Sequence, residues 1–441
     1  MSSLIDETHD PKRRSWVPSA NGHPEFPIQN LPLGVFSPNG AGPRGGIAIG
    51  DEILDLKAAL EAGLLSGDAE KAAIAAAGAT LNPVMALGSG PRTALRKQLS
   101  ALLAADGPER AKVEKLAPRL LHKARDCVLH LPAAVGAFTD FFAGIHHAYN
   151  AGVRGGRQPP LVPNYKYVPV AYHSRASSVV ASGASIRRPS GQRLLPAENA
   201  PSFGPCLKLD IELELGVWIG PGNALGETIP IAQAAGHVVG FCMLNDWSAR
   251  DIQRWEMQPL GPFLAKNFGT TVSPWVITIE ALAPFRRPQP ARPDGDPRPL
   301  PYLWDDTDQQ QGAFDVEIEA LISTARMRAR GMTPHRLALS NLMHLYWTVA
   351  QMVAHHACGG CNLQPGDLFG SGTVSAPDAS GYGCLAELSD DGNKRIELPS
   401  GEARTFLEDG DEVVLRASAR RDGFATIGFG ECSGRVVGDQ G

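Results

Sequence analysis

Carboxylates spaced two apart are the clearest chemical feature of the chain. In the segment 208–216, Lys-Leu-Asp-Ile-Glu-Leu-Glu-Leu-Gly, polar and apolar residues alternate, which is typical of a β-strand. Residues two apart on a strand share a face, so Asp210, Glu212 and Glu214 are expected to lie side by side. Adjacent carboxylates repel one another unless a positive charge neutralises them. A solvated polar face is the alternative interpretation, because many sheets have one.

Further acids stand where strands are expected to end. Asp140 lies among phenylalanines, and Asp246 follows directly after an apolar run. Together with Glu212 and Glu214 they would supply only oxygen ligands, which suit Ca²⁺ or Mg²⁺ rather than Zn²⁺. Each acid by itself is better explained as a cap or a surface carboxylate, so the metal site depends on their meeting in the fold.

A histidine and a basic cluster could supply the other groups of an enzyme. His147 lies a few residues after Asp140, and a histidine near a metal-bound acid is a natural general base. Arg250 and Gln253 would share one face of a helical turn, and Lys266 follows in a Gly/Pro-rich segment. Such donors can hold a carboxylate or a developing oxyanion. A buried, satisfied histidine and a set of surface cations are the alternatives.

Two other motifs do not indicate a further function. Cys358 and Cys361 have a Cys-x-x-Cys spacing beside two histidines, but no second pair stands at a spacing suited to zinc. The glycine-rich segment 370–373 lacks the P-loop lysine, so nucleotide binding is not expected.

Composition is that of an ordinary globular protein, with 441 residues, 43% of them hydrophobic and 20% charged. The formal net charge of −5 indicates neither a nucleic-acid nor an anionic-membrane partner. The start lacks the layout of a signal peptide, and no apolar run is long enough to span a membrane. Seven scattered cysteines fit a reducing compartment, so we expect a cytoplasmic protein.

The 48 glycines and 36 prolines favour many turns and short strands. Residues 51–130 are the exception, because they are rich in helix formers. We expect a small N-terminal domain over 1–130, built from strands with helices attached, and a larger β-rich domain over 131–441. In the larger domain we predict one long helix over Thr333–His356, with Thr333 as N-cap and glycines after its end.

Several segments, in their order along the chain, match a known pattern. They are Phe26–Phe36, Thr139–Phe142, His147–Asn150, Pro163–Tyr165, Tyr172–Ser178, Arg187–Gln192, Leu209–Glu214, Asn245–Gln253, Gly261–Trp275, Asn362–Asp367 and Gly372–Thr373. In these segments the chain resembles the fumarylacetoacetate hydrolase family in its full-length, two-domain form. The resemblance covers nearly the whole chain, whereas smaller family members lack the N-terminal piece and much of the interior.

The resemblance implies a mostly β fold with α-helices, in which a small SH3-like barrel precedes a large mixed β-roll. It implies a homodimer with the site in the large domain, and a small diketo acid as substrate. The implied reaction is hydrolysis of a carbon–carbon bond of 4-fumarylacetoacetate to fumarate and acetoacetate. That reaction is the last step of tyrosine and phenylalanine catabolism.

The resemblance also implies roles for individual residues. The positions that match calcium ligands are Asp140, Glu212, Glu214 and Asp246. Lys266 and Thr270, again with Asp246, match positions near a second, magnesium site. His147 matches the base that activates water, and Glu387 matches the acid that orients it. The positions that match substrate-holding groups are Arg250, Gln253, Lys266, Tyr172 and Thr373.

Substrate positions depart from the family pattern more than metal positions do. Phe142 and Met257 stand where the family has tyrosines. Gly156 replaces an arginine that would meet a substrate carboxylate, and the neighbouring Arg157 or Arg154 is the alternative for that contact. The resemblance therefore supports the type of reaction more strongly than it supports the particular substrate. A related acylpyruvate or other 1,3-diketo acid is the alternative substrate.

A non-catalytic, metal-binding β scaffold is the alternative from another class. The retained His147 and Glu387 argue against it, because a scaffold needs no water activator.

Overall fold

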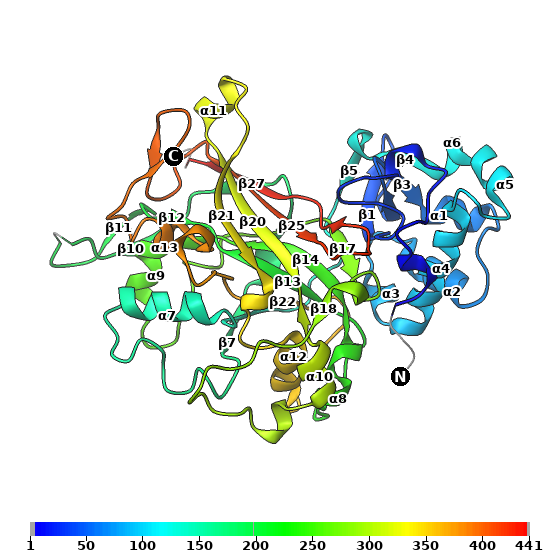
Figure 1. The fold of residues 1–441 in the computed structure, drawn as a ribbon. Coiled ribbons are helices and arrows are strands. Elements are labelled where there is room, and N and C mark those ends of the chain that lie inside the picture. The colour runs from blue at the N-terminus through cyan, green and yellow to red at the C-terminus, as the bar shows by residue number, and fades with distance from the viewer. Residues whose placement is uncertain (1–4, 197, 439–441) are drawn as a thin grey trace.

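The computed structural model describes residues 5–196 and 198–438, and they form a β-rich fold with helices at its edges (Figure 1). A smaller N-terminal part lies beside a larger part that is crossed by long strands (Figure 1). This mixture confirms the predicted fold class. No helix in the described ranges has the length and apolar character to cross a membrane.

The N-terminal part is a small antiparallel sheet with helices packed on it. Its strands are β1 (Leu33–Pro38), β2 (Arg44–Ile49), β3 (Glu52–Asp55), β4 (Leu121–Lys123) and β5 (Cys127–Leu129). Its helices are α1 (Leu56–Glu61), α2 (Gly67–Ala76), α3 (Asn82–Met85), α4 (Ser89–Leu103), α5 (Arg110–Lys115) and α6 (Ala117–Leu120). The helices predicted from the composition of residues 51–130 are therefore present.

One sheet continues from the N-terminal part into the candidate site, because β1 pairs with β17. Its order from β1 onward is β1-β17-β14-β13-β22-β6-β7, with β16 on β14 and β8 on β16. The bounds are β6 (Phe138–Phe141), β7 (Ala171–Ser174), β8 (Val179–Ala181), β13 (Leu213–Ile219), β14 (Val238–Asp246), β16 (Thr270–Val272), β17 (Trp275–Thr278) and β22 (Leu368–Gly370). All residues of β13 and β14 are buried, so these central strands lie in the core.

A second sheet packs against the first in the larger part. It consists of β21 (His335–Asn341), β20 (Val316–Ser323), β25 (Glu412–Ala419), β27 (Cys432–Val437) and β9 (Ser185–Arg187), with β26 (Ile427–Gly428) on β25. Small strand pairs complete the fold: β10 (Ser190–Arg193) with β11 (Ser202–Pro205), β12 (Leu209–Asp210) with β15 (Ser248–Ala249), β18 (Arg286–Arg287) with β19 (Ala313–Phe314), and β23 (Ile396–Glu397) with β24 (Ala403–Arg404).

Short helices surround these sheets. They are α7 (Ile145–Arg154), α8 (Ile231–Ala234), α9 (Arg250–Glu256), α10 (Asp306–Gln311), α11 (Ala325–Ala329), α12 (Val349–Ala357) and α13 (Leu385–Leu388). In Figure 1, α8, α10 and α12 gather at one end of the larger part, and α7, α9 and α13 lie near one another.

The predicted helix over Thr333–His356 is wrong in its first half. Residues His335–Asn341 form β21, which pairs antiparallel with β20. Leu342–His344 then form one 3-10 turn, and the α-helix begins only with α12. Thr348 rather than Thr333 caps α12 through a reciprocal bond with Gln351. Sheet pairing has overridden the local helix propensity of this leucine- and alanine-rich segment.

The strand predicted over 208–216 is interrupted. Residues Leu209–Asp210 form β12 and pair with β15, whereas β13 begins at Leu213 and pairs with β14 and β22. Ile211 and Glu212, between them, belong to neither strand. Because β12 and β13 pair with different strands, this break decides where the acids of the segment lie.

Candidate active site

The acidic residues predicted as metal ligands meet in the fold. Asp140, Glu212, Glu214 and Asp246 each offer a carboxylate oxygen, and these oxygens lie within 4.8 Å of one another. Pairing of β22 with β6 and β13, and of β13 with β14, brings the strands of Asp140, Glu214 and Asp246 together, and Glu212 directly precedes β13. All four side chains are buried, none more than 5% exposed, so the solvated-face alternative is wrong. We call this group the acidic cluster.

Donors from two other segments hold one side of the acidic cluster. Lys266 Nζ donates to Glu212 Oε2 at 2.6 Å and to Asp246 Oδ2 at 2.7 Å. Thr270 Oγ1 and the Tyr172 hydroxyl also donate to Asp246, at 2.7 and 3.0 Å. Burial lowers the pKa of Lys266, but Asp246 and Glu212 outweigh it and raise that pKa, so the lysine is charged.

The other side of the acidic cluster lacks a partner. Asp140 Oδ1 and Glu214 Oε1 are buried and have no hydrogen-bond donor among the described residues. Burial first, and neighbouring carboxylates next, raise the pKa of both groups well above the usual range. Buried carboxylates without partners are costly, and a hard divalent cation is the partner that an all-oxygen ligand set prefers. The residues present therefore fit such a cation.

Gly370 leaves room for these carboxylates. A Cβ atom at this position of β22 would lie 2.6 Å from Asp140 Oδ1 and 2.8 Å from Glu214 Oε2. Both separations are too short for non-bonded atoms, so any side chain here would displace the acids.

His147 and Glu387 form a buried pair beside the acidic cluster. His147, on α7, lies with Nδ1 2.7 Å from Glu387 Oε2, on α13. Asn150 Nδ2 and Ser375 Oγ also donate to this carboxylate, at 2.8 and 2.7 Å.

Glu387 is ionised in this environment. Burial raises its pKa, but the charge and hydrogen bond of His147, with the bonds from Asn150 and Ser375, outweigh burial and lower the pKa to about 2. An ionised carboxylate only accepts hydrogen bonds, so Nδ1 of His147 carries a proton, and in the neutral imidazole Nε2 is the acceptor.

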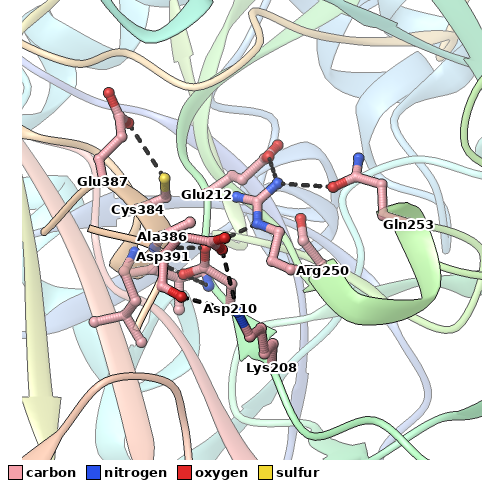
Figure 2. Close-up of polar contacts among 12 residues, drawn as sticks. Lys208, Asp210, Glu212, Arg250, Gln253, Cys384, Ala386, Glu387 and Asp391 are labelled. Atoms are coloured by element: carbon pink, nitrogen blue, oxygen red, sulfur yellow. Dashed lines mark hydrogen bonds and ion pairs between the residues drawn. The ribbon is translucent and has the colours of Figure 1, made fainter. Parts of the chain in front are cut away.

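Arg250, the first residue of α9, connects the acidic cluster to Asp210 on β12 (Figure 2). Its Nε donates to Asp210 at 2.8 Å, and its Nη1 donates to Glu212 at 2.8 Å and to Gln253 at 3.2 Å. Its Nη2 is buried and has no acceptor among the described residues. One donor of the guanidinium therefore remains for an anionic oxygen.

Asp210 is the important residue for which sequence reasoning gave no role. It is fully buried and accepts from the backbone N–H groups of Leu385 at 2.6 Å and Ala386 at 3.0 Å, in the first turn of α13. It also accepts from Arg250. The alternating pattern places Asp210 beside Glu212 and Glu214, but the strand breaks after β12 and Asp210 bonds to α13 instead of joining the acidic cluster. Asp210 thus joins Arg250 to the helix that carries Glu387.

Only some of the residues predicted to contact the substrate lie near the acidic cluster and the His147–Glu387 pair. Thr373 Oγ1 is buried without a partner among the described residues, and the N–H of the preceding Gly372 donates to Glu214. The Phe142 ring meets the His147 ring edge-on, with centroids 5.4 Å apart. Met257 is 43% exposed after α9, and Arg157 is exposed after α7. The structure therefore brings Thr373 and Phe142 to the site, while the contacts expected of Met257 and Arg157 remain predictions.

A buried all-oxygen cluster beside a histidine–glutamate pair is the arrangement expected of a hydrolase that uses a hard cation. Residues 29–132 match the family model described as Fumarylacetoacetase N-terminal, and residues 137–437 match the one described as Fumarylacetoacetate (FAA) hydrolase C-terminal. The chain belongs to the fumarylacetoacetase family.

Relatives cover nearly the full chain. A fumarylacetoacetase from Bos taurus is 44% identical over 429 residues, which are 96% of this chain and 98% of that protein. One from Oryza sativa subsp. japonica is 45% identical over 96% of this chain and 97% of that protein, and one from Homo sapiens is 44% identical over 96% and 98%. A crystal structure of Cg1458 with an inhibitor has a TM-score of 0.50 over 93% of this chain and 100% of that one, at 14% identity, and supports the fold alone.

The substitution Gly370→Ala should weaken binding of a divalent cation, because the new methyl group displaces the oxygens of Asp140 and Glu214. We expect at least about a tenfold loss of Ca²⁺ or Mg²⁺ affinity, equivalent to about 1.4 kcal/mol, by titration calorimetry. Gly42→Ala is the control, since nothing lies within 4 Å of a Cβ atom there. Equal cation affinities in the two variants would show that cation binding does not need the space that Gly370 leaves for the carboxylates.

The substitution Asp210→Asn should lower the free energy of unfolding by about 3 kcal/mol, because it removes a negative charge that neutralises the buried guanidinium of Arg250. Urea unfolding measures the change. Asp409→Asn is the matched control, because Asp409 pairs with Arg188 while its own side chain is 51% exposed, and we expect a cost below about 1 kcal/mol there. Indistinguishable unfolding midpoints would contradict the joining role of Asp210.

Proposed function

We propose that this protein hydrolyses 4-fumarylacetoacetate to fumarate and acetoacetate, the last step of tyrosine and phenylalanine catabolism. The supporting observation is a set of buried, unpartnered polar atoms of both kinds at one place. Asp140 Oδ1 and Glu214 Oε1 are acceptors, whereas Arg250 Nη2 and Thr373 Oγ1 are donors. A cation and an oxygen-rich substrate together would satisfy them. The relatives named above are fumarylacetoacetases, which supports the same substrate.

We assign Ca²⁺ to the acidic cluster, and Mg²⁺ to a second position near Asp246, Lys266 and Thr270. When bound, a divalent cation supplies Lewis-acid polarisation of the two carbonyl oxygens and stabilises the enolate that leaves. The ammonium of Lys266 is positive and donates to Glu212 and Asp246. Its side chain therefore cannot be a ligand, and only its main-chain oxygen could contribute to the magnesium position.

His147 acts as the general base in this proposal. Glu387 holds the Nδ1–H of the imidazole, which fixes the ring and leaves Nε2 to take a proton from the attacking water. The ionised Glu387 also stabilises the imidazolium that forms. Asn150 and Ser375 keep the carboxylate in place through their hydrogen bonds.

Arg250, Gln253 and Lys266 stabilise negative charge as it develops. Arg250 is already oriented by Asp210 and Glu212, so its Nη2 needs no reorganisation to meet an oxyanion. A preorganised donor of this kind is worth about 3–4 kcal/mol of transition-state stabilisation. The charged Lys266, buried against Glu212 and Asp246, supplies positive charge for the departing carbanion.

We propose that Tyr172, Thr373, Phe142, Met257 and Arg157 contact the rest of the substrate. Phe142 offers a ring edge instead of a hydroxyl next to His147, which favours a second candidate, hydrolysis of a related acylpyruvate or other 1,3-diketo acid. The test is to compare kcat/KM for fumarylacetoacetate and for acylpyruvates. Preference for fumarylacetoacetate supports the main proposal, and slow turnover of it beside rapid turnover of an acylpyruvate supports the second.

We further propose a homodimeric, cytoplasmic enzyme with an SH3-like N-terminal domain over 1–130 and a catalytic β-roll domain over 131–441. All cysteines of the chain are free, which agrees with a reducing compartment.

Chelation by EDTA should abolish activity, and Mg²⁺ or Ca²⁺ should restore it. Removal of the cation leaves the acidic cluster with uncompensated repulsion, so we also expect a lower Tm by differential scanning calorimetry. An unchanged Tm together with full activity after chelation would contradict the metal role.

Replacing His147 with Ala should lower kcat by at least about 100-fold, because the general base is lost. Cation affinity should stay unchanged, since His147 is not in the acidic cluster. His146→Ala is the control, because His146 precedes His147 on α7 and its ring meets that of His344 edge-on. Among the described residues it is His147, not His146, that is hydrogen-bonded to Glu387. Full activity of the His147 variant would remove the proposed mechanism.

A further inference from the structure

Cys384 is a buried thiol that the proposed mechanism does not use. It precedes α13, it is fully buried, and its Sγ donates to Glu387 Oε2 at 3.2 Å (Figure 2). The same sulfur lies 4.0 Å from His147 Nδ1. Nitrogen, sulfur and oxygen donors thus meet beside the acidic cluster. We call His147, Cys384 and Glu387 the thiol cluster.

The spacing of the thiol cluster is close to that of a tetrahedral zinc site. With Zn–S bonds of about 2.3 Å and Zn–N or Zn–O bonds of about 2.0–2.2 Å, the ligand atoms of such a site lie about 3.4–3.6 Å apart. Here the separations are 2.7 Å for N and O, 3.2 Å for S and O, and 4.0 Å for S and N. Changes of roughly 0.4–0.7 Å would bring the three atoms to zinc geometry.

The two clusters differ in chemical softness. The acidic cluster offers only carboxylate oxygens, which select Mg²⁺ or Ca²⁺. The thiol cluster offers a thiol and an imidazole, which select Zn²⁺ or Cd²⁺ and bind Mg²⁺ poorly. Saturation of the acidic cluster with Mg²⁺ would therefore not protect the thiol cluster.

We propose that His147, Cys384 and Glu387 form an inhibitory site for a thiophilic divalent cation such as Zn²⁺. On binding, the thiol loses its proton to solvent and the thiolate bonds to the cation. The imidazole keeps one proton, which moves from Nδ1 to Nε2 while Nδ1 bonds to the cation. Nε2 then carries hydrogen and cannot take a proton from water, so hydrolysis stops. The inhibition rests on the proposed function, whereas the binding does not.

Cadmium titration tests the binding without any assay of activity. The protein is the full chain saturated with Mg²⁺, with the exposed Cys358 and Cys361 changed to serine so that they cannot bind the probe. We expect the ultraviolet charge-transfer absorption of a cadmium–thiolate bond to saturate at one equivalent. Adding Cys384→Ser, or Cys384→Ala if the serine variant does not fold, should abolish it. No absorption, or absorption unchanged by both substitutions, would overturn the site.

Inhibition by Zn²⁺ tests whether a cation bound at the thiol cluster stops hydrolysis. Each variant is compared with its own activity before Zn²⁺ is added, at constant saturating Mg²⁺. We expect the zinc concentration for half inhibition to rise at least about tenfold when Cys384 is replaced, because the thiolate ligand is lost. Equal inhibition with and without Cys384 would overturn the proposal. Cadmium binding in a protein that does not hydrolyse fumarylacetoacetate would refute the proposed function alone.

Discussion

The repulsion among four buried carboxylates is the constraint on which the rest of the site depends. No stable fold can bury them without positive charge or protons close by. Lys266 compensates Glu212 and Asp246, and burial with like-charged neighbours leaves Asp140 and Glu214 favouring the protonated state in the absence of a cation. Burial of the acidic cluster therefore costs electrostatic free energy, and a bound hard cation lowers that cost. Cation binding should for this reason also stabilise the folded protein.

The fold connects the acidic cluster to the His147–Glu387 pair through a few short segments. Glu212 lies in the break between β12 and β13, where Arg250 reaches it from α9. Asp210, two residues earlier, accepts from both Arg250 and the first turn of α13, which carries Glu387. The acidic cluster, Arg250 and the His147–Glu387 pair, to which we assign cation binding, oxyanion stabilisation and water activation, are therefore connected by one buried hydrogen-bond network. A displacement of α13 would disturb His147 and Arg250 together.

The sequence was informative where chemistry depends on residue type and uninformative where it depends on how strands pair. Acids following apolar runs pointed to Asp140 and Asp246, whose carboxylate oxygens lie within 4.8 Å of that of Glu214. Strict alternation over 208–216 also placed Asp210 beside them, but β12 and β13 pair with different strands, and the break between them turns Asp210 away. Cys384 was not predicted because its position next to His147 arises from contacts between segments distant along the chain. The helix predicted from residue 333 failed for a similar reason, since its first half completes a sheet.

The most direct measurement of the central claim is anomalous diffraction from crystals soaked in Mn²⁺, an ion that prefers the same oxygen ligands. The account predicts a strong anomalous peak in contact with the carboxylates of Asp140 and Glu214, the oxygens that lack donors within the described chain. An acidic cluster free of anomalous density at saturating Mn²⁺, or a peak bound elsewhere with these carboxylates protonated, would contradict it.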